Sequence, residues 1–296
     1  MSENPVIALI GPGAIGTTIA AVLHDAGRTP LLCGRTAHPE LRLRYDEGET
    51  VVPGPVFTDP SVITRPADLV FVAVKTTQNS DSAGWLRALC DENTVVCALQ
   101  NGVEQKAQLE PLVSGTTVLP SVVWFPAQRE PDASVWLRAK PRLTLPDVPQ
   151  AQRVVEALRG TRCEVQLSED FPTVAWRKLL QNAVAGLMVL ANRRVGMFRR
   201  EDVSELALAY LREGLTVARA EGAKLNDDVA QEILANFQRA PEDLGTSILA
   251  DRQADRPMEW DIRNGVIQRY GRRYGIAVPI SDVVVPLLAA GSEGPG

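Results

Sequence analysis

Histidine is scarce in this sequence of 296 residues, which contains only His24 and His38. A Ser-His-Asp hydrolase or a histidine-rich metal site needs imidazole groups that such a chain can hardly supply. We therefore expect no metal centre. The four cysteines are scattered without any CxxC spacing. This pattern predicts reduced thiols in a cytoplasmic protein rather than a disulfide framework.

Long apolar runs and an excess of basic residues are also missing. No stretch approaches the roughly 18 consecutive apolar residues of a transmembrane helix. The first residues, MSENPVIALIGPG, lack the basic region of a signal peptide. The net charge is −5 and the pI is near 5.3, which argues against nucleic acid or an anionic membrane as a partner. A composition of 45% hydrophobic and 23% charged residues is typical of a soluble globular protein.

The first half of the chain contains short apolar runs separated by a dozen or more residues, which indicates βαβ units and a parallel sheet. These runs are Val6–Ile10, Thr29–Cys33, Asp68–Val74 and Thr94–Gln100. Three further runs, at 118–125, 135–138 and 142–145, lie close together, and we expect them to extend the same sheet in antiparallel fashion. A helix over 154–158 and a strand over 163–167 complete this half.

From Phe171 onward helical periodicity dominates, with helices expected near 173–191, 201–221, 226–238, 246–252, 258–274 and 281–290. The polar stretch LSEDFPT, with Pro172, marks the boundary between the halves. The predicted fold class is therefore α/β, with a Rossmann dinucleotide-binding domain over 1–168 and an all-α domain over 169–296.

A glycine-rich loop follows the first strand and opens a helix, the setting in which GxGxxG indicates a dinucleotide site. The loop consists of Gly11, Pro12, Gly13, Ala14, Ile15 and Gly16. The first glycine permits a tight turn, the second lets the backbone approach a pyrophosphate, and the third lets the helix pack on the strand. The helix N-terminus then offers free N–H groups to the phosphates.

The end of the second strand indicates which dinucleotide binds. NAD sites place an acidic residue there to hold the ribose 2′-hydroxyl, but this chain has no acid between Asp25 and Glu40. Arg35 stands there instead, and its planar guanidinium suits a 2′-phosphate. The predicted cofactor is NADP. Lys75 and Asn101 follow two later strands, so both side chains should lie near the cofactor.

The helix WRKLLQNAVAG places Lys178 and Asn182 four residues apart on one face. Hydride transfer to a ketone leaves an alkoxide that must be protonated, and no histidine is present in the second half. Lys178 is the natural donor, because desolvation lowers a lysine pKa and its charge stabilises an oxyanion. Ser247 and Glu259 lie in a later segment dense in polar groups.

Taken together, these motifs resemble the ketopantoate reductases, also called 2-dehydropantoate 2-reductases. The resemblance covers nearly the whole chain and rests on GPGAIG, AVK, LQNGV, GTT, WRKLLQN, TSILAD, EWDIRNG and GIAVP in the family's order and spacing. It implies that NADPH and a 2-oxo acid meet between a Rossmann domain and an all-α domain. The implied reaction is reduction of ketopantoate to (R)-pantoate in pantothenate biosynthesis.

The resemblance also implies roles for individual residues. Lys178 is the proton donor, and Asn101 touches both cofactor and substrate. Asn182 and Ser247 hold substrate oxygens, and Glu259 lies near the nicotinamide. We assign Ser121 to the cofactor site as well. A homodimer is a possible assembly.

One departure from the family pattern leaves the substrate open. The family usually has an asparagine where this chain has Gly186, and a second near Gly196. A glycine there would leave room for a bulkier substrate, so a paralogous reductase of another branched or aromatic 2-oxo acid, or of a related carbonyl, is an alternative. A second alternative is an NADP-binding regulator without turnover, although such a protein has no need of Lys178, Asn182 and Glu259.

Overall fold

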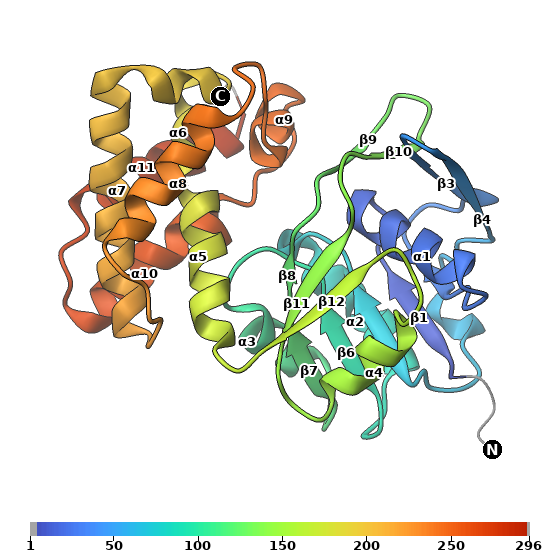
Figure 1. Ribbon diagram of the computed structural model, residues 1–296. Helices are drawn as coiled ribbons and strands as arrows, with labels where there is room; N and C mark the ends of the chain where they lie inside the picture. Colours follow the sequence, from blue (N-terminus) through green and yellow to red (C-terminus); the bar gives the residue numbers. More distant parts are fainter. Residues whose placement is uncertain (1–4, 295–296) are drawn as a thin grey trace. The chain divides into compact units, whose positions relative to one another are not determined.

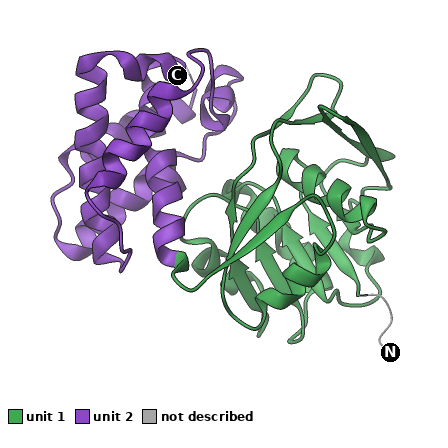
Figure 2. Cartoon of the chain, viewed as in Figure 1, with its two compact units in different colours: residues 1–171 green, residues 172–296 purple. Residues whose placement is uncertain are grey.

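The computed structural model describes residues 5–294, and the chain divides into two compact units, residues 1–171 and 172–296 (Figure 2). The break between Phe171 and Pro172 lies three residues after the boundary expected at 168/169. Among residues 5–294, all the strands lie in unit 1, and unit 2 is helical.

The centre of unit 1 is a five-stranded parallel sheet in the order β2-β1-β5-β6-β7 (Figure 1). Its strands are β1 (Ile7–Ile10), β2 (Leu31–Cys33), β5 (Leu69–Val72), β6 (Val95–Ala98) and β7 (Thr117–Pro120). Every residue of β1, β5 and β6 is buried. A strand covered on both faces must be apolar throughout, which explains why these segments are continuous hydrophobic runs.

Helices cover both faces of this sheet, because successive side chains of a strand point to opposite sides. Leu9 and Phe71 pack in one core with residues of α1 (Ala14–Asp25). The alternate residues Ala8 and Val70 pack in a second core with residues of α2 (Asn79–Leu89). Because the strands are parallel, their carboxyl ends all lie at one edge of the sheet, and the glycine loop and Asn101 are found at this edge.

The expectation that the strands after β6 extend this sheet in antiparallel fashion is wrong. Strand β7 joins the main sheet parallel to β6, and the later strands form two separate small sheets. One of these has the order β12-β11-β8, formed by β8 (Val122–Val123), β11 (Arg142–Pro146) and β12 (Glu164–Ser168). The helix before β12 is α4 (Ala151–Ala157). Local patterns specify a strand but not its partner, because pairing depends on distant residues.

The second small sheet has the order β4-β3-β10-β9 and includes a hairpin that was not expected from the sequence. Its strands are β3 (Glu40–Tyr45), β4 (Gly48–Pro53), β9 (Ala127–Arg129) and β10 (Val135–Leu137). In β3, Leu41 and Leu43 are buried, while Arg42 between them is exposed. This alternation is the signature of a half-buried strand, and it could have revealed β3.

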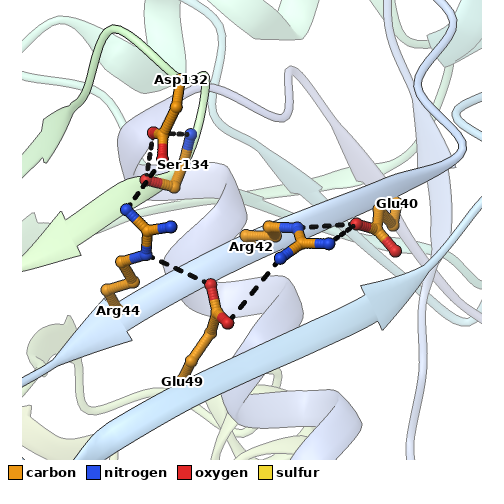
Figure 3. Close-up of polar contacts among 6 residues, drawn as sticks. All are labelled: Glu40, Arg42, Arg44, Glu49, Asp132 and Ser134. Carbon is orange, nitrogen blue, oxygen red and sulfur yellow. Dashed lines mark hydrogen bonds and ion pairs between the residues drawn. The ribbon is translucent and has the colours of Figure 1, made fainter.

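The outer face of this sheet holds a chain of ion pairs (Figure 3). Arg44 lies 2.8 Å from Asp132 and 3.3 Å from Glu49, which in turn pairs with Arg42 at 3.8 Å. Hydrogen bonds from Ser134 keep the pKa of Asp132 below its usual value, with Arg44 acting in the same direction. These groups are exposed, so we expect the pairs to contribute little to stability.

Unit 2 is built from helices packed around one another (Figure 1). They are α5 (Phe171–Val184), α6 (Gly186–Ala191), α7 (Glu201–Ala220), α8 (Asp228–Arg239), α9 (Ser247–Gln253), α10 (Val266–Tyr274) and α11 (Pro279–Ser292). Two expected helices differ in detail. The helix predicted over 173–191 is interrupted at Ala185, and the one predicted over 258–274 begins with a π-helical turn, η5 (Asp261–Gly265).

Candidate active site

The glycine loop of unit 1 has a different steric requirement at each glycine. Gly11 has φ +89°, and an added Cβ would lie 2.6 Å from Cγ1 of Val74. At Gly16 an added Cβ would collide with the carbonyl of Gly11, so the helix packs directly on the turn. At Gly13, by contrast, an added Cβ would meet no atom of the described chain within 4 Å. The loop is therefore closed on its inner side and open at Gly13.

Helix α1 begins at this open point. Gly13 is its N-cap, and no side chain of the described residues caps it. The first turn contains no acidic residue. A 12-residue helix leaves its first N–H groups without intrahelical partners, and its dipole adds partial positive charge there. Residues 11–16 thus fit a pyrophosphate in both shape and charge.

Arg35 follows β2, as expected, and its side chain is 69% exposed. Nη1 lies 3.7 Å from Oδ2 of Asp81 in the first turn of α2. A pair this exposed and this long is weak. The guanidinium is therefore held loosely and could exchange Asp81 for a phosphate.

Lys75 and Asn101 lie just beyond the ends of β5 and β6, as expected from the sequence. A buried amide network that was not anticipated supports the second of these loops. Gln100 donates from Nε2 to the carbonyl of Val74 at 2.9 Å and to Oδ1 of Asn79 at 2.6 Å. The network connects the end of β6 to the end of β5. The sequence signal that could have revealed this network is the polar Gln100 at the end of an apolar run.

Ser121, which we expected in the cofactor site, makes its hydrogen bonds within unit 1. Ser121 is 1% exposed, and its hydroxyl donates to the carbonyl of Ala98 at 2.5 Å. Its backbone N–H donates to Gln105, and Gln105 donates back to its carbonyl. The hydrogen bonds of Ser121 therefore join β6 to the segment after β7.

In unit 2, helix α5 presents Lys178 and Asn182 on one face, and both side chains are half-buried. The opposite, apolar face is in the core, as predicted. Its residues are Leu179, Leu180 and Val184, each 1% exposed, and Leu187 of the following helix α6 is 5% exposed. An amphipathic helix of this kind fixes the direction of its polar face by burying the other.

Ser247 and Glu259 are joined by a residue that the sequence reasoning missed. Arg263, in the π-helical turn, donates from Nη2 to Oγ of Ser247 at 3.0 Å and lies 3.8 Å from Oε2 of Glu259. Arg263 is 4% exposed and Glu259 is 8% exposed. The only sequence signal was the spacing of four between Glu259 and Arg263, which on a helix brings opposite charges together.

Gly186 does not leave the space expected of it. An added Cβ would lie 2.7 Å from Nδ2 of Asn264 and 3.1 Å from Cδ1 of Leu288. The side chain of Asn264 fills the place beside the glycine, and its Nδ2 donates to the carbonyl of Ala183 and to the Tyr210 hydroxyl. The inference that Gly186 makes room for a bulkier substrate is therefore wrong. Gly196 is likewise packed, against Glu242.

Within residues 5–294, no group of three or more His, Cys, Asp or Glu side chains is arranged to hold a metal ion. The helices of the same range are also all too short or too polar to cross a membrane.

Comparison with known proteins decides the family. The family model "Ketopantoate reductase PanE/ApbA" matches residues 7–150, and the model of its C-terminal part matches residues 170–292. The chain belongs to the ketopantoate reductase family. Enzymes of this family use a nicotinamide cofactor, in agreement with the glycine loop.

Relatives extend over nearly the whole chain. A 2-dehydropantoate 2-reductase from Mycobacterium tuberculosis is 54% identical over 98% of this chain and 99% of its own. One from Caulobacter vibrioides is 35% identical over 96% of this chain and 98% of its own. The solved structure of a dimeric ketopantoate reductase from Staphylococcus aureus superposes with a TM-score of 0.88 at 25% identity, covering 98% of this chain and all of its own.

Proposed function

We propose that this protein reduces 2-dehydropantoate (ketopantoate) to (R)-pantoate with NADPH, a step of pantothenate biosynthesis. The principal support is the 54% identity, over almost the full length of both chains, to a protein named for that reaction. The retention of Lys178, Asn182, Ser247 and Glu259 in the family's spacing adds to it. The free cysteines suit a reducing cytoplasm, where we place the reaction.

The cofactor is held by unit 1. The pyrophosphate binds at the open side of Gly13, against the N–H groups of Ala14, Ile15 and Gly16. Arg35 binds the 2′-phosphate that distinguishes NADPH from NADH, releasing its weak pair with Asp81. Pro12 and Lys75 complete the phosphate side.

The reaction needs a proton as well as a hydride. The nicotinamide, when bound, supplies the hydride to the 2-oxo carbon. Lys178 donates its proton to the alkoxide oxygen and stabilises the negative charge that develops there. Asn101 orients the 2-oxo group, and Asn182 and Ser247 hydrogen-bond the other substrate oxygens. Glu259, buried beside Arg263, borders the nicotinamide.

The two alternatives have less support. A reductase of a bulkier 2-oxo acid was suggested by Gly186, but Asn264 fills the space that such a substrate would need. A regulator without turnover would have no use for a half-buried lysine and asparagine on one face of α5.

The decisive experiment measures NADPH oxidation at 340 nm with ketopantoate and with a panel of branched and aromatic 2-oxo acids. We expect kcat/KM for ketopantoate to exceed that for each other acid by at least tenfold. A larger value for a bulkier acid would favour the paralogous reductase, and cofactor binding without oxidation of NADPH would favour the regulator.

We also propose that the chain forms a homodimer through α11. Val283 and Leu287 are 61% and 53% exposed, and Pro286 and Ala290 beside them are exposed as well. These residues recur at three- and four-residue intervals, so they form one apolar stripe. The structural relative described as dimeric supports a second copy of the chain as the partner.

A further inference from the structure

The position of Arg263 is unusual for an arginine. It lies in the π-helical turn η5, and 96% of its surface is removed from solvent. Its Nη2 group contacts the Ser247 hydroxyl at 3.0 Å and approaches the Glu259 carboxylate to 3.8 Å. Its Nε–H has no acceptor among residues 5–294. Arg263 is thus a buried cation whose donors are only partly matched.

The surroundings of Arg263 are balanced in charge. Burial lowers the pKa of its guanidinium, and the carboxylates of Glu259 and Asp251 oppose that effect. Asp251 also lies 3.2 Å from Arg256. An arginine remains protonated even when buried. Two carboxylates are therefore offset by two arginines, and the cluster presents no net negative charge to an anionic substrate.

Arg263 also determines which way the Ser247 hydroxyl acts. A guanidinium has five N–H donors and no acceptor, so Ser247 Oγ can only accept from it. The hydroxyl proton of Ser247 must then point to another acceptor. Ser247 is exposed at the start of α9, whereas the arginine beneath it is buried. The pair therefore presents one charge-assisted O–H donor to the surface of unit 2.

Stability of the fold does not by itself explain why Arg263 is buried. Breaking a buried ion pair is costly, but replacing the whole pair with apolar side chains is often neutral or stabilising. Stability therefore gives no reason for a buried arginine with an unmatched N–H. A role in function does explain the buried arginine, because it polarises the Ser247 hydroxyl toward an incoming anion. Arg263 reaches that serine from a different helix, 16 residues along the chain.

We propose that Arg263 is a positioning residue that fixes Ser247 as a hydrogen-bond donor to the carboxylate of the 2-oxo acid. This inference rests on the proposed function, because it takes the substrate to be an anion held by Ser247. Arg263 itself does not touch the reacting atoms. It acts through Ser247.

The test is a double-mutant cycle on the full-length protein, with KM and kcat for ketopantoate and the dissociation constant of NADPH measured for each variant. Arg263→Met and Ser247→Ala should each raise KM about tenfold, the effect of one hydrogen bond to a charged group. Both should leave NADPH affinity within twofold and lower kcat much less than they raise KM. In the Ser247→Ala background, Arg263→Met should add less than twofold to KM.

Two further variants keep the cycle interpretable. Arg269→Met is the matched control, since Arg269 is an arginine of the same helical segment, is 41% exposed and pairs with Asp261 instead. It should behave as wild type. Arg263→Gln loses the charge but stays polar, and it replaces Arg263→Met if the latter does not fold. It should raise KM at least threefold.

The outcomes separate the two proposals. Multiplicative increases in KM, to about a hundredfold in the double variant, would show that Arg263 does not act through Ser247, and would overturn this inference. So would an unchanged KM in Arg263→Met or, where that variant does not fold, in Arg263→Gln. If the wild-type protein does not reduce ketopantoate at all, the proposed function fails first.

Discussion

The side chain of Asn264 lies against the backbone of Gly186, with Nδ2 at 2.7 Å from where a Cβ would stand. The amide is held there by hydrogen bonds to the carbonyl of Ala183 and to the hydroxyl of Tyr210. All of these residues are buried. Glycine at 186 is thus required by the packing of unit 2.

We predict that Gly186→Asn destabilises the protein by about 1–3 kcal/mol, because an added side chain overpacks a filled site. Thermal unfolding measures the loss. Gly186→Ala should cost clearly less in an Asn264→Ala background, where the obstructing amide is gone. Additive effects of those two substitutions would mean that the residues do not interact. A rise in kcat/KM for ketopantoate in Gly186→Asn would restore the view that the glycine shapes the substrate site.

Arg35 should select the cofactor. Arg35→Ala is expected to weaken NADPH binding by about 1–3 kcal/mol while leaving NADH binding nearly unchanged, since only NADPH has the 2′-phosphate. Both dissociation constants can be measured by fluorescence titration. Asp81→Asn provides the opposite control, because it removes the anion that pairs with Arg35. It should tighten NADPH binding by up to about threefold. Equal losses for both cofactors in Arg35→Ala would exclude recognition of the phosphate.

Lys178 should be needed for the chemical step. Lys178→Ala is expected to keep the fold and NADPH affinity but to lower kcat by about 10²–10⁴, the share usually due to general acid catalysis. Arg177→Gln is the matched control, because Arg177 is the preceding cation on α5 and pairs with Glu232 at 2.7 Å. It should retain wild-type turnover. More than half of wild-type turnover in Lys178→Ala would remove the lysine from the mechanism.

The apolar stripe on α11 should mediate self-association. Leu287→Glu is expected to convert a dimer into a monomer, because a charge in the centre of an apolar contact must be desolvated without a partner. Sedimentation velocity gives the mass of each species. Leu206→Glu changes an exposed leucine on α7 and should leave the mass unchanged. A wild-type protein that sediments as a monomer at micromolar concentration would refute the dimer.

The cysteines should be unreactive in the folded protein. Burial raises the pKa of Cys33, Cys90, Cys97 and Cys163 to about 12. At pH 8 the folded thiols are therefore protonated, and we expect slow reaction with Ellman's reagent until the protein unfolds. In the unfolded chain a thiol ionises near pH 8.5, so stability should be unaffected at lower pH and fall above about pH 9. Rapid titration of all four thiols in native protein would contradict this.

Local sequence was sufficient for much of this molecule. The strand, glycine loop and helix at the N-terminus were predictable because they follow one another directly in the chain, and Gly16 packs against the carbonyl of Gly11 only five residues before it. The contact of Gly11 with Val74 is the long-range exception. The polar face of α5 was predictable because helical periodicity places Lys178 and Asn182 together and buries Leu179 and Leu180 opposite them. The placement of Arg35 follows from the length of the same βαβ unit.

Tertiary structure decided the rest, because the deciding contacts join residues far apart in the chain. The strands after β7 pair in two separate small sheets, and no local sequence pattern specifies this pairing. Asn264 meets Gly186 across 78 positions and fills the space that the sequence suggested was empty. Arginine is usually found at the surface, so the sequence gives no sign that Arg263 is buried. The packing of unit 2 buries it beneath Ser247. The sequence alone thus determined the chemistry available to this protein, and the fold determined which groups are free to perform it.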